Sequence, residues 1–554
     1  MKTSSIMRNL FLLVLILITS APFLSAQTSD TAGSAMRLYN HVSILASDEF
    51  GGRLTGTKYE KKASGYISNY YKEYGLEPLG NNKNYLQAFA FTPAIELGKK
   101  NSFKIEKNKY PVNEKWYPVP VSSSGKVEGT VVNETAGISE SGSQAGNILL
   151  LNLAIPADAD PHDPSIGWRS RLDAAAKTEP AAVVLYNAPN DISLDGMRGI
   201  SNLQPYKFLV VHVGEEIATE LQRDESAASS VKISVDLKKP EKTGHNVIGY
   251  IDNNASSTIV IGAHYDHLGM GEYGSSLSAA TGEIHNGADD NASGTAVLLE
   301  LAMQVKKASL SNHNYLFLAF SGEELGLLGS NYFTRHLPEE LPKMMAMLNM
   351  DMVGRLNPQS QELGINGTGT SPVWDSLLNI IRVGNIREKT TSSGMGSSDH
   401  TSFYLKEIPA IHFFTGVHSD YHKPSDDVEK LNITGMAAVS QYIFEMILHL
   451  EKLDQMEFIK TKNDGSTVPR FKVTLGIMPD YFYDKGGLRV EGVSEGKPAS
   501  EAGMKDGDII LQMGDVPVRD IMSYMQALSH FSKGDEVEVL VKRKEETRKL
   551  KVKF

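Results

Sequence analysis

The chain of 554 residues contains no cysteine and only three tryptophans. Without Cys there can be no disulfide, no thiolate metal site and no iron–sulfur cluster. Basic residues are also in deficit, because 55 Lys and Arg face 66 Asp and Glu, which gives a formal charge of −11. A protein with this negative charge is repelled by the phosphate backbone of a nucleic acid. We therefore expect no nucleic-acid partner.

The longest apolar run lies near the N-terminus. It reads LFLLVLILIT, follows Lys2 and Arg8, and is followed by small residues before Gln27. This pattern predicts a secretory signal peptide over residues 1–26, and an uncut membrane anchor is the alternative. Removing residues 1–26, which hold two basic residues and no acidic one, moves the formal charge from −11 to −13. We expect an exported bacterial protein, periplasmic or extracellular, with no stable membrane span after cleavage.

One short apolar run ends on side chains that bind metals. In SSTIVIGAHYDHLGM, residues 256–270, β-branched residues predict a buried strand over Thr258 to Gly262, and His264 and His267 follow. Two histidines after one strand are also compatible with an ordinary loop. Whether they mark a site depends on the ends of the other strands.

Other segments repeat this arrangement. The apolar runs 315–320 and 344–350 each precede carboxylates, two aspartates precede a predicted helix over 296–305, and the apolar segment 409–414 precedes a loop rich in His and Asp. Ligands of open α/β sheets bind just beyond the carboxyl ends of the strands. The pattern therefore predicts that five loops converge on one site.

The residue types narrow the metal that this site would hold. A mixed set of imidazoles and carboxylates suits zinc, manganese or cobalt better than magnesium or calcium. Two metals about 3.5–4 Å apart need a bridging carboxylate, and they hold a water that is nucleophilic at neutral pH. The loops supply one aspartate to share, with a His and a further carboxylate for each metal.

Six motifs in this region resemble peptidase family M28, which comprises zinc-dependent co-catalytic aminopeptidases and their relatives. They are, in chain order, AHYDH, GADDNASG, SGEELGLLGS, NMDMVG, GSSDHTSF and SDYHKPSDD. The resemblance implies an α/β fold with a central mixed, mostly parallel sheet flanked by helices. It implies two zinc ions per chain that share a hydroxide and hydrolyse N-terminal residues from peptides. The implied zinc ligands are His264, Asp290, Glu324, Asp351 and His422, with Asp290 bridging.

The resemblance also assigns roles to neighbouring residues. Glu323 aligns with the general base, and adjacent glutamates make chemical sense if one binds metal while the other moves a proton. Asp266 is expected to hold the second ring nitrogen of His264. It also places Tyr421 as an oxyanion donor and Asp399 near the site without a defined task. His267 and His418 are interpreted as structural on other grounds, because HSDYHKP lacks the Glu of H-E-x-x-H and leads into Pro424.

Two other functions fit parts of the sequence. A glutaminyl-peptide cyclase would need one zinc ion, and a non-catalytic binding protein would use the accessory domains alone. The complete ligand set and the base favour the peptidase, because receptor-like relatives of this fold lose ligands.

The chain divides into segments that differ in composition and in hydrophobic pattern. Between residues 112 and 239 short β-runs such as NILLLNL and FLVVHVG are separated by polar turns, and this part resembles a protease-associated (PA) domain. An unrelated β-rich insertion is the alternative. The predicted division is a signal peptide over 1–26, a peptidase domain over 27–111 and 240–455, the insert over 112–239, a linker over 456–468 and a PDZ domain over 469–554.

The C-terminal segment resembles a PDZ domain of bacterial proteases. TLGI, residues 474–477, stands where the loop that binds a peptide carboxylate belongs, so the amides of Leu475, Gly476 and Ile477 are the predicted contacts. An extended peptide would add to the neighbouring strand. The alternative is a domain that packs against the peptidase or gates it. Expected partners are therefore peptide substrates and a peptide or protein ligand of the PDZ domain.

Overall fold

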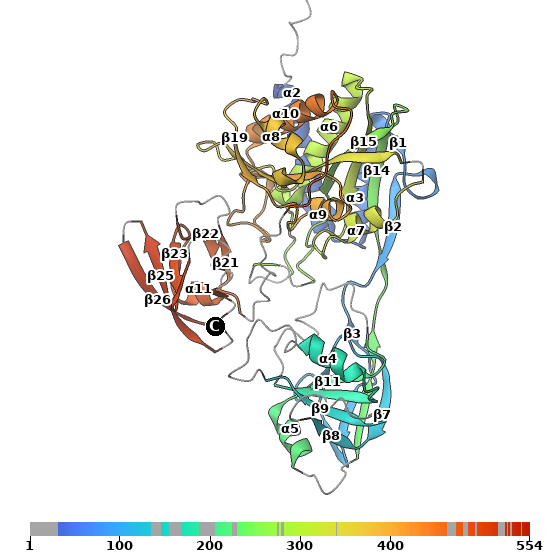
Figure 1. Cartoon of the computed structure of the whole chain (residues 1–554), viewed down its shortest axis with the longest axis vertical. Coiled ribbons are helices and arrows are strands. Elements are labelled where there is room, and N and C mark those ends of the chain that lie inside the picture. Colours follow the sequence, from blue (N-terminus) through green and yellow to red (C-terminus); the bar gives the residue numbers. More distant parts are fainter. Residues whose placement is uncertain are drawn as a thin grey trace, which may run out of the picture.

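Figure 1 shows the computed structural model of the chain. It describes residues 31–554 apart from 135–145, 155–167, 188–204, 224–229, 462–472, 480–485, 519–523 and several shorter gaps. The predicted signal peptide and most of the predicted linker lie outside the described residues.

The largest sheet has nine strands, in the order β1-β14-β16-β15-β17-β20-β18-β19, with β2 also paired to β14. The four central strands β16, β15, β17 and β20 are parallel to one another, whereas β14 and β18 flank them in antiparallel pairs. The expected mixed sheet is thus confirmed. The strands are β1 Glu77–Pro78, β2 Leu86–Phe91, β14 Lys242–Ile251, β15 Ser257–His264, β16 Asn314–Phe320, β17 Lys343–Met350, β18 Glu362–Asn366, β19 Arg387–Thr391 and β20 Ala410–Phe414.

Both faces of this sheet are buried, which is why its central strands read as continuous apolar runs. Successive side chains point to opposite faces, so Ile259 and Ile261 enter one core while Val260 enters the other. The first core is covered by α2 Thr31–Leu45, α3 Lys58–Glu73, α6 Gly294–Ala308 and α10 Ile433–Leu450. The second is covered by α7 Leu328–Arg335 and α9 His400–Tyr404.

Local signals set the ends of the helix α3. The hydroxyl of Thr57 accepts hydrogen bonds from the amides of Tyr59 and Glu60, and Gly75 follows the helix with a φ of 72°. These signals place the ends of α3 at Lys58 and Glu73. Among the described helices α10 alone is long and apolar enough to cross a membrane, but 61% of that stretch is buried inside the protein.

A second group of elements lies between β2 and β14. One sheet has the order β6-β11-β10-β9-β8 and another the order β5-β4-β12-β7, and they have cores of their own. The first sheet consists of β6 Trp116–Pro118, β8 Val131–Glu134, β9 Ile148–Asn152, β10 Ala182–Tyr186 and β11 Leu209–Val213. The second consists of β4 Ser102–Ile105, β5 Asn108–Tyr110, β7 Gly125–Gly129 and β12 Val231–Val235, and the helices are α4 Trp168–Ala176 and α5 Glu215–Gln222.

The start of this insert differs from the predicted residue 112. Strand β4 pairs with β12, and β3 Glu96–Leu97 pairs with β13 Leu237–Lys238, so the chain leaves the main sheet soon after β2. The reason is long-range pairing: β3 and β4 find their partners β13 and β12 more than a hundred positions later, and β5 pairs with β4. The assignment of the insert to the PA type stays a prediction.

The C-terminal elements form a separate six-stranded sheet, in the order β21-β22-β23-β25-β26 with β24 paired to β23. They are β21 Ile477–Pro479, β22 Leu488–Val493, α11 Pro498–Glu501, β23 Ile509–Met513, β24 Val516–Pro517, β25 Glu536–Arg543 and β26 Glu546–Lys553. Leu475 is fully buried in their core. The amide of Gly476 donates to the Thr474 hydroxyl over 3.0 Å, and Ile477 begins the edge strand.

Candidate metal centre

The carboxyl ends of the parallel strands bring together the predicted metal-binding side chains. His264 is the last residue of β15, and Asp351 directly follows β17. Glu324 follows β16 by four residues, and Asp290 lies in the turn that precedes α6. His422 comes from the loop between β20 and α10. This is the edge of the sheet at which the sequence predicts a site.

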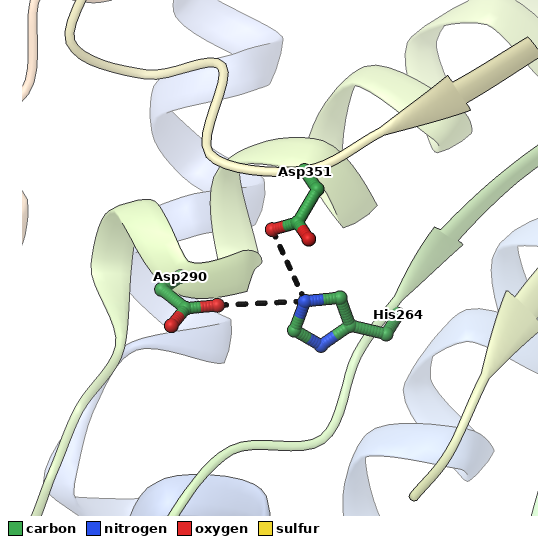
Figure 2. Close-up of side chains that lie close together, drawn as sticks. All are labelled: His264, Asp290 and Asp351. Atoms are coloured by element: carbon green, nitrogen blue, oxygen red, sulfur yellow. Dashed lines mark hydrogen bonds and ion pairs between the residues drawn. The ribbon is translucent and has the colours of Figure 1, made fainter. Parts of the chain in front are cut away.

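One group of ligand atoms surrounds the imidazole of His264. Its Nε2 lies 3.2 Å from Asp351 Oδ1 and 3.4 Å from Asp290 Oδ1. Figure 2 shows the two carboxylates, from different loops, facing the same ring nitrogen. Two ligand atoms held about 2.0 Å from one tetrahedral zinc ion lie about 3.3 Å apart, so these separations fit a shared metal.

A second group surrounds the imidazole of His422. Its Nε2 lies 3.3 Å from Asp290 Oδ2 and 3.1 Å from Glu324 Oε2. Asp290 therefore offers one oxygen to the first group and its other oxygen to the second. The two groups share this carboxylate, which is the arrangement that a bridged metal pair requires.

Asp266 supports the first group. The nearest partner of His264 Nδ1 is the backbone carbonyl of Asp266 at 3.2 Å, and the carboxylate Oδ1 of the same residue lies at 3.7 Å. That carboxylate accepts the amide N–H of Glu323 over 3.2 Å and the hydroxyl of Thr55 over 2.9 Å. Asp266 thus ties the metal-binding strand end to the loop that carries Glu323.

Asp289 and Asp290 have different surroundings although they are neighbours. Asp289 Oδ1 accepts the amide of Gly354 over 2.7 Å, and its Oδ2 lies 3.2 Å from His418 Nε2. The amides of both aspartates donate to Asp426 Oδ2, over 2.9 and 3.1 Å. Asp289 is therefore held by the loops around the site, which leaves Asp290 to face the imidazoles.

The pKa values of the two adjacent glutamates are shifted in opposite directions. Burial raises the pKa of Glu323 well above its usual value although His264 opposes the shift, and repulsion from Asp351 and Glu324 adds to it. Burial also disfavours ionised Glu324, but the imidazoles of His422 and His267 hold its pKa well below the usual value. One carboxyl group of the pair is thus prepared to hold a proton and the other to stay ionised.

Asp399 and Tyr421 lie beside these groups. Asp399 is fully buried, and burial raises its pKa to about 7 although His264 opposes the shift. The ring of Tyr421 stacks on that of His422 with centroids 3.9 Å apart. Burial and the charges of Asp290 and Glu324 raise the pKa of Tyr421 well above its usual value, so its hydroxyl stays protonated and able to donate.

Two residues at the site lay outside the predicted set. His267 is buried with its Nδ1 2.7 Å from Glu324 Oε1, although the sequence favoured a structural role for it. Arg53 is fully buried and donates to four backbone carbonyls, those of Leu45, Tyr265, Asn286 and Gly287. The local signal was a lone Arg in the glycine-rich stretch EFGGRLTG. Arg53 ties the loop after β15 to the loop before Asp290.

Comparison with known proteins identifies the family that these loops match. The model of peptidase family M28 matches residues 246–447, which include the five loops that carry the predicted metal ligands. The chain carries an M28 peptidase domain. The M28 peptidase domain is followed by a match to the PDZ domain model over residues 458–554.

Relatives of known name match a larger part of the chain. Aminopeptidase YwaD of Bacillus subtilis is 26% identical over 420 residues, which are 72% of this chain and 81% of the relative. Leupeptin-inactivating enzyme 1 of Streptomyces exfoliatus is 27% identical over 270 residues, which are 46% of this chain and 56% of the relative. The solved structure of an aminopeptidase from Aneurinibacillus sp. strain AM-1 is 22% identical in sequence, with a TM-score of 0.47. The match covers 77% of this chain and 95% of the aminopeptidase chain.

Proposed function

We propose that the M28 peptidase domain of this chain is a zinc-dependent aminopeptidase that removes N-terminal residues from peptides. The observation that carries this proposal is the placement of Asp290, whose two oxygens lie 3.4 and 3.3 Å from the imidazoles of His264 and His422. The names of the two curated relatives described above, an aminopeptidase and a leupeptin-inactivating enzyme, support a peptidase acting on short peptides.

The donor set fits zinc. Each group offers one imidazole nitrogen and two carboxylate oxygens, and the donor separations from each imidazole of 3.1–3.4 Å match a tetrahedral ion with one position left for water or substrate. His264, Asp290 and Asp351 would hold one ion, and Asp290, Glu324 and His422 the other. Zinc bound there supplies a Lewis acid and lowers the pKa of a bound water.

The side chains around the donors have separable tasks. Glu323 takes the proton of the attacking water on its ionised carboxylate and returns it to the departing amine. The Tyr421 hydroxyl donates to the oxygen that becomes negative as the scissile carbonyl is attacked. Asp266 holds the ring of His264 in place, and Asp399 lies buried near the same imidazole.

The decisive experiment uses the chain from Gln27 onward and a panel of short peptides. Each peptide is supplied with a free N-terminus, with an acetylated N-terminus, and with an amidated C-terminus. We expect cleavage of the free and the amidated forms only, lost with a chelator and restored by zinc. The matched control is Asp351→Asn, which replaces one charged donor of the first group by a neutral amide. Release of C-terminal residues, or cyclisation of N-terminal glutamine without hydrolysis, contradicts the proposal.

We further propose that the PDZ domain binds an extended peptide along the open side of β21. This strand lies at the edge of its sheet, so its outer backbone groups are available to a partner strand. The amide of Gly476 already donates to Thr474, which leaves fewer amides for a terminal carboxylate. Fluorescence polarisation with labelled peptides, compared between free and amidated C-termini, tests binding and the need for the carboxylate.

A third proposal concerns location. The charged start, the apolar run and the small residues before Gln27 lead us to infer export of the bacterial protein, with residues 1–26 removed. N-terminal sequencing of the protein recovered from the periplasm or medium tests this. A protein that keeps Met1 and remains in the membrane fraction contradicts it.

A further inference from the structure

His267 lies at the metal centre but belongs to neither group of predicted ligands. Its Nδ1 is 2.7 Å from Glu324 Oε1 and 3.8 Å from Asp290 Oδ2. Its other ring nitrogen, Nε2, is buried and has no hydrogen-bond partner among the described residues. The side chain is completely buried. Among the described residues, the polar side chain at hydrogen-bond distance from it is the carboxylate of Glu324.

The separations distinguish a ligand from a hydrogen-bond donor. Two atoms bound to one tetrahedral zinc ion lie about 3.3 Å apart, and the pairs around His264 and His422 are separated by 3.1–3.4 Å. The 2.7 Å between His267 and Glu324 is too short for that arrangement. It is the length of a charge-assisted N–H···O hydrogen bond.

The chemistry of the pair determines which atom carries the proton. A carboxylate that binds a metal is ionised and can only accept a hydrogen bond. His267 must therefore donate through Nδ1–H. The ring packs against the backbone of Gly287, where a side chain would not fit because its Cβ atom would lie 2.5 Å from the Cδ2 of His267.

We propose that His267 is a positioning residue that restricts Glu324 to binding metal through one oxygen. The hydrogen bond occupies Oε1, while Oε2 faces His422 at 3.1 Å, where the second metal would lie. The inference rests on the proposed function, in which Glu324 is a ligand of that metal. Without the hydrogen bond both carboxylate oxygens are free to turn toward the ion or toward Glu323.

The test compares two variants of His267 with a matched control. His267→Ala removes the donor, whereas His267→Asn keeps an N–H near the position of Nδ1. The control is His285→Ala: His285 is buried as well, its ring centroid lies 6.5 Å from that of His267, and it pairs with Ser276 and the carbonyl of Glu283. Zinc affinity is measured for each binding step by competition with a chelator, and imidazoles per zinc are counted by X-ray absorption.

We expect His267→Ala to weaken one of the two zinc-binding steps about 10–100-fold, the usual cost of losing a group that orients a ligand. His267→Asn and the control should bind zinc as the wild type does. The wild type and His267→Ala should both show one imidazole per zinc. Three imidazoles for two zinc ions in the wild type would make His267 a ligand and overturn the proposal, as would unchanged zinc binding by a folded His267→Ala.

Other outcomes are also decisive. If His267→Ala does not fold, the imidazole count of the wild type and the zinc affinity of His267→Asn decide the question, and loss of affinity in His267→Asn contradicts the proposal. A wild-type chain that binds two zinc ions but cleaves no peptide refutes the proposed function and leaves this inference standing. A wild type that binds no second zinc refutes both.

Discussion

Replacing Glu323 by Gln is the sharpest test of how the two glutamates divide their work. The substitution keeps the size of the side chain but removes its ability to accept a proton. Glu323 is attached to the site through its backbone, because its amide donates to Asp266 Oδ1 over 3.2 Å. Among the described residues no ion pair uses its carboxylate, whereas that of Glu324 contacts His422 and His267. Glu323→Gln should therefore leave the metal donors intact.

The expected magnitude follows from the role of a general base. Such a group contributes about 10²–10⁴-fold to the rate, which corresponds to about 2.7–5.4 kcal/mol because each tenfold change in rate is about 1.36 kcal/mol. We expect kcat of Glu323→Gln to fall by this factor, with KM and zinc content unchanged. Glu324→Gln is the companion variant, and it should lose zinc from the second group.

The assay combines steady-state kinetics on a peptide with a free N-terminus and zinc analysis of the same samples. Both variants are compared at equal free zinc, so that metal loss and chemical impairment are distinguished. The reasoning is refuted if Glu323→Gln keeps more than about a tenth of the wild-type kcat. It is also refuted if that variant loses a zinc ion while Glu324→Gln retains both.

Three further predictions concern pH, the oxyanion and the core. Burial opposes protonation of His264 and His422, but nearby carboxylates raise the pKa of both imidazoles well above the usual value in the metal-free site. Zinc must therefore displace a proton from each imidazole, so the affinity for zinc should fall as the pH is lowered. Chelator competition at several pH values tests this, and an affinity that does not change with pH would contradict it. Tyr421→Phe should lower kcat about 10²–10³-fold with the thermal midpoint unchanged, and an unaltered kcat would exclude the oxyanion role. Leu348→Ala, at a fully buried position of β17, should lower the free energy of unfolding by about 2–5 kcal/mol in urea denaturation, and a loss below about 1 kcal/mol would contradict the packing described.

The metal centre was predictable because its side chains follow strands that are visible locally. His264 and Asp351 each come at the end of an apolar run, and parallel strands place such ends together. Neither sequence periodicity nor spacing could indicate which ring nitrogen of His267 faces Glu324, because that depends on how two loops 57 residues apart approach each other. The donors around Asp290 were therefore easier to infer than the residues that orient them.

The N-terminal part was less predictable for the same reason. The partners of Arg53 include carbonyls 212 and 234 residues later, and no local pattern points to them. Strands β4 and β12 pair although nearly the whole insert separates them in sequence. The residue pattern between 92 and 112 therefore did not show where the main sheet ends. Burial of Leu475 in the PDZ core likewise depends on strands that follow it.

The hydrogen bonds of Arg53 to distant backbone carbonyls affect the order in which the chain folds. Its partners at Tyr265 and Gly287 are synthesised more than two hundred residues after it, so α2 and α3 cannot complete their contacts until the insert has been made. The insert has cores of its own and can fold meanwhile. Contacts between distant residues slow folding, because a long loop must close before they form. Until then the glycine-rich segment around Arg53 stays accessible, and a protease added during refolding should cut there before it cuts the insert.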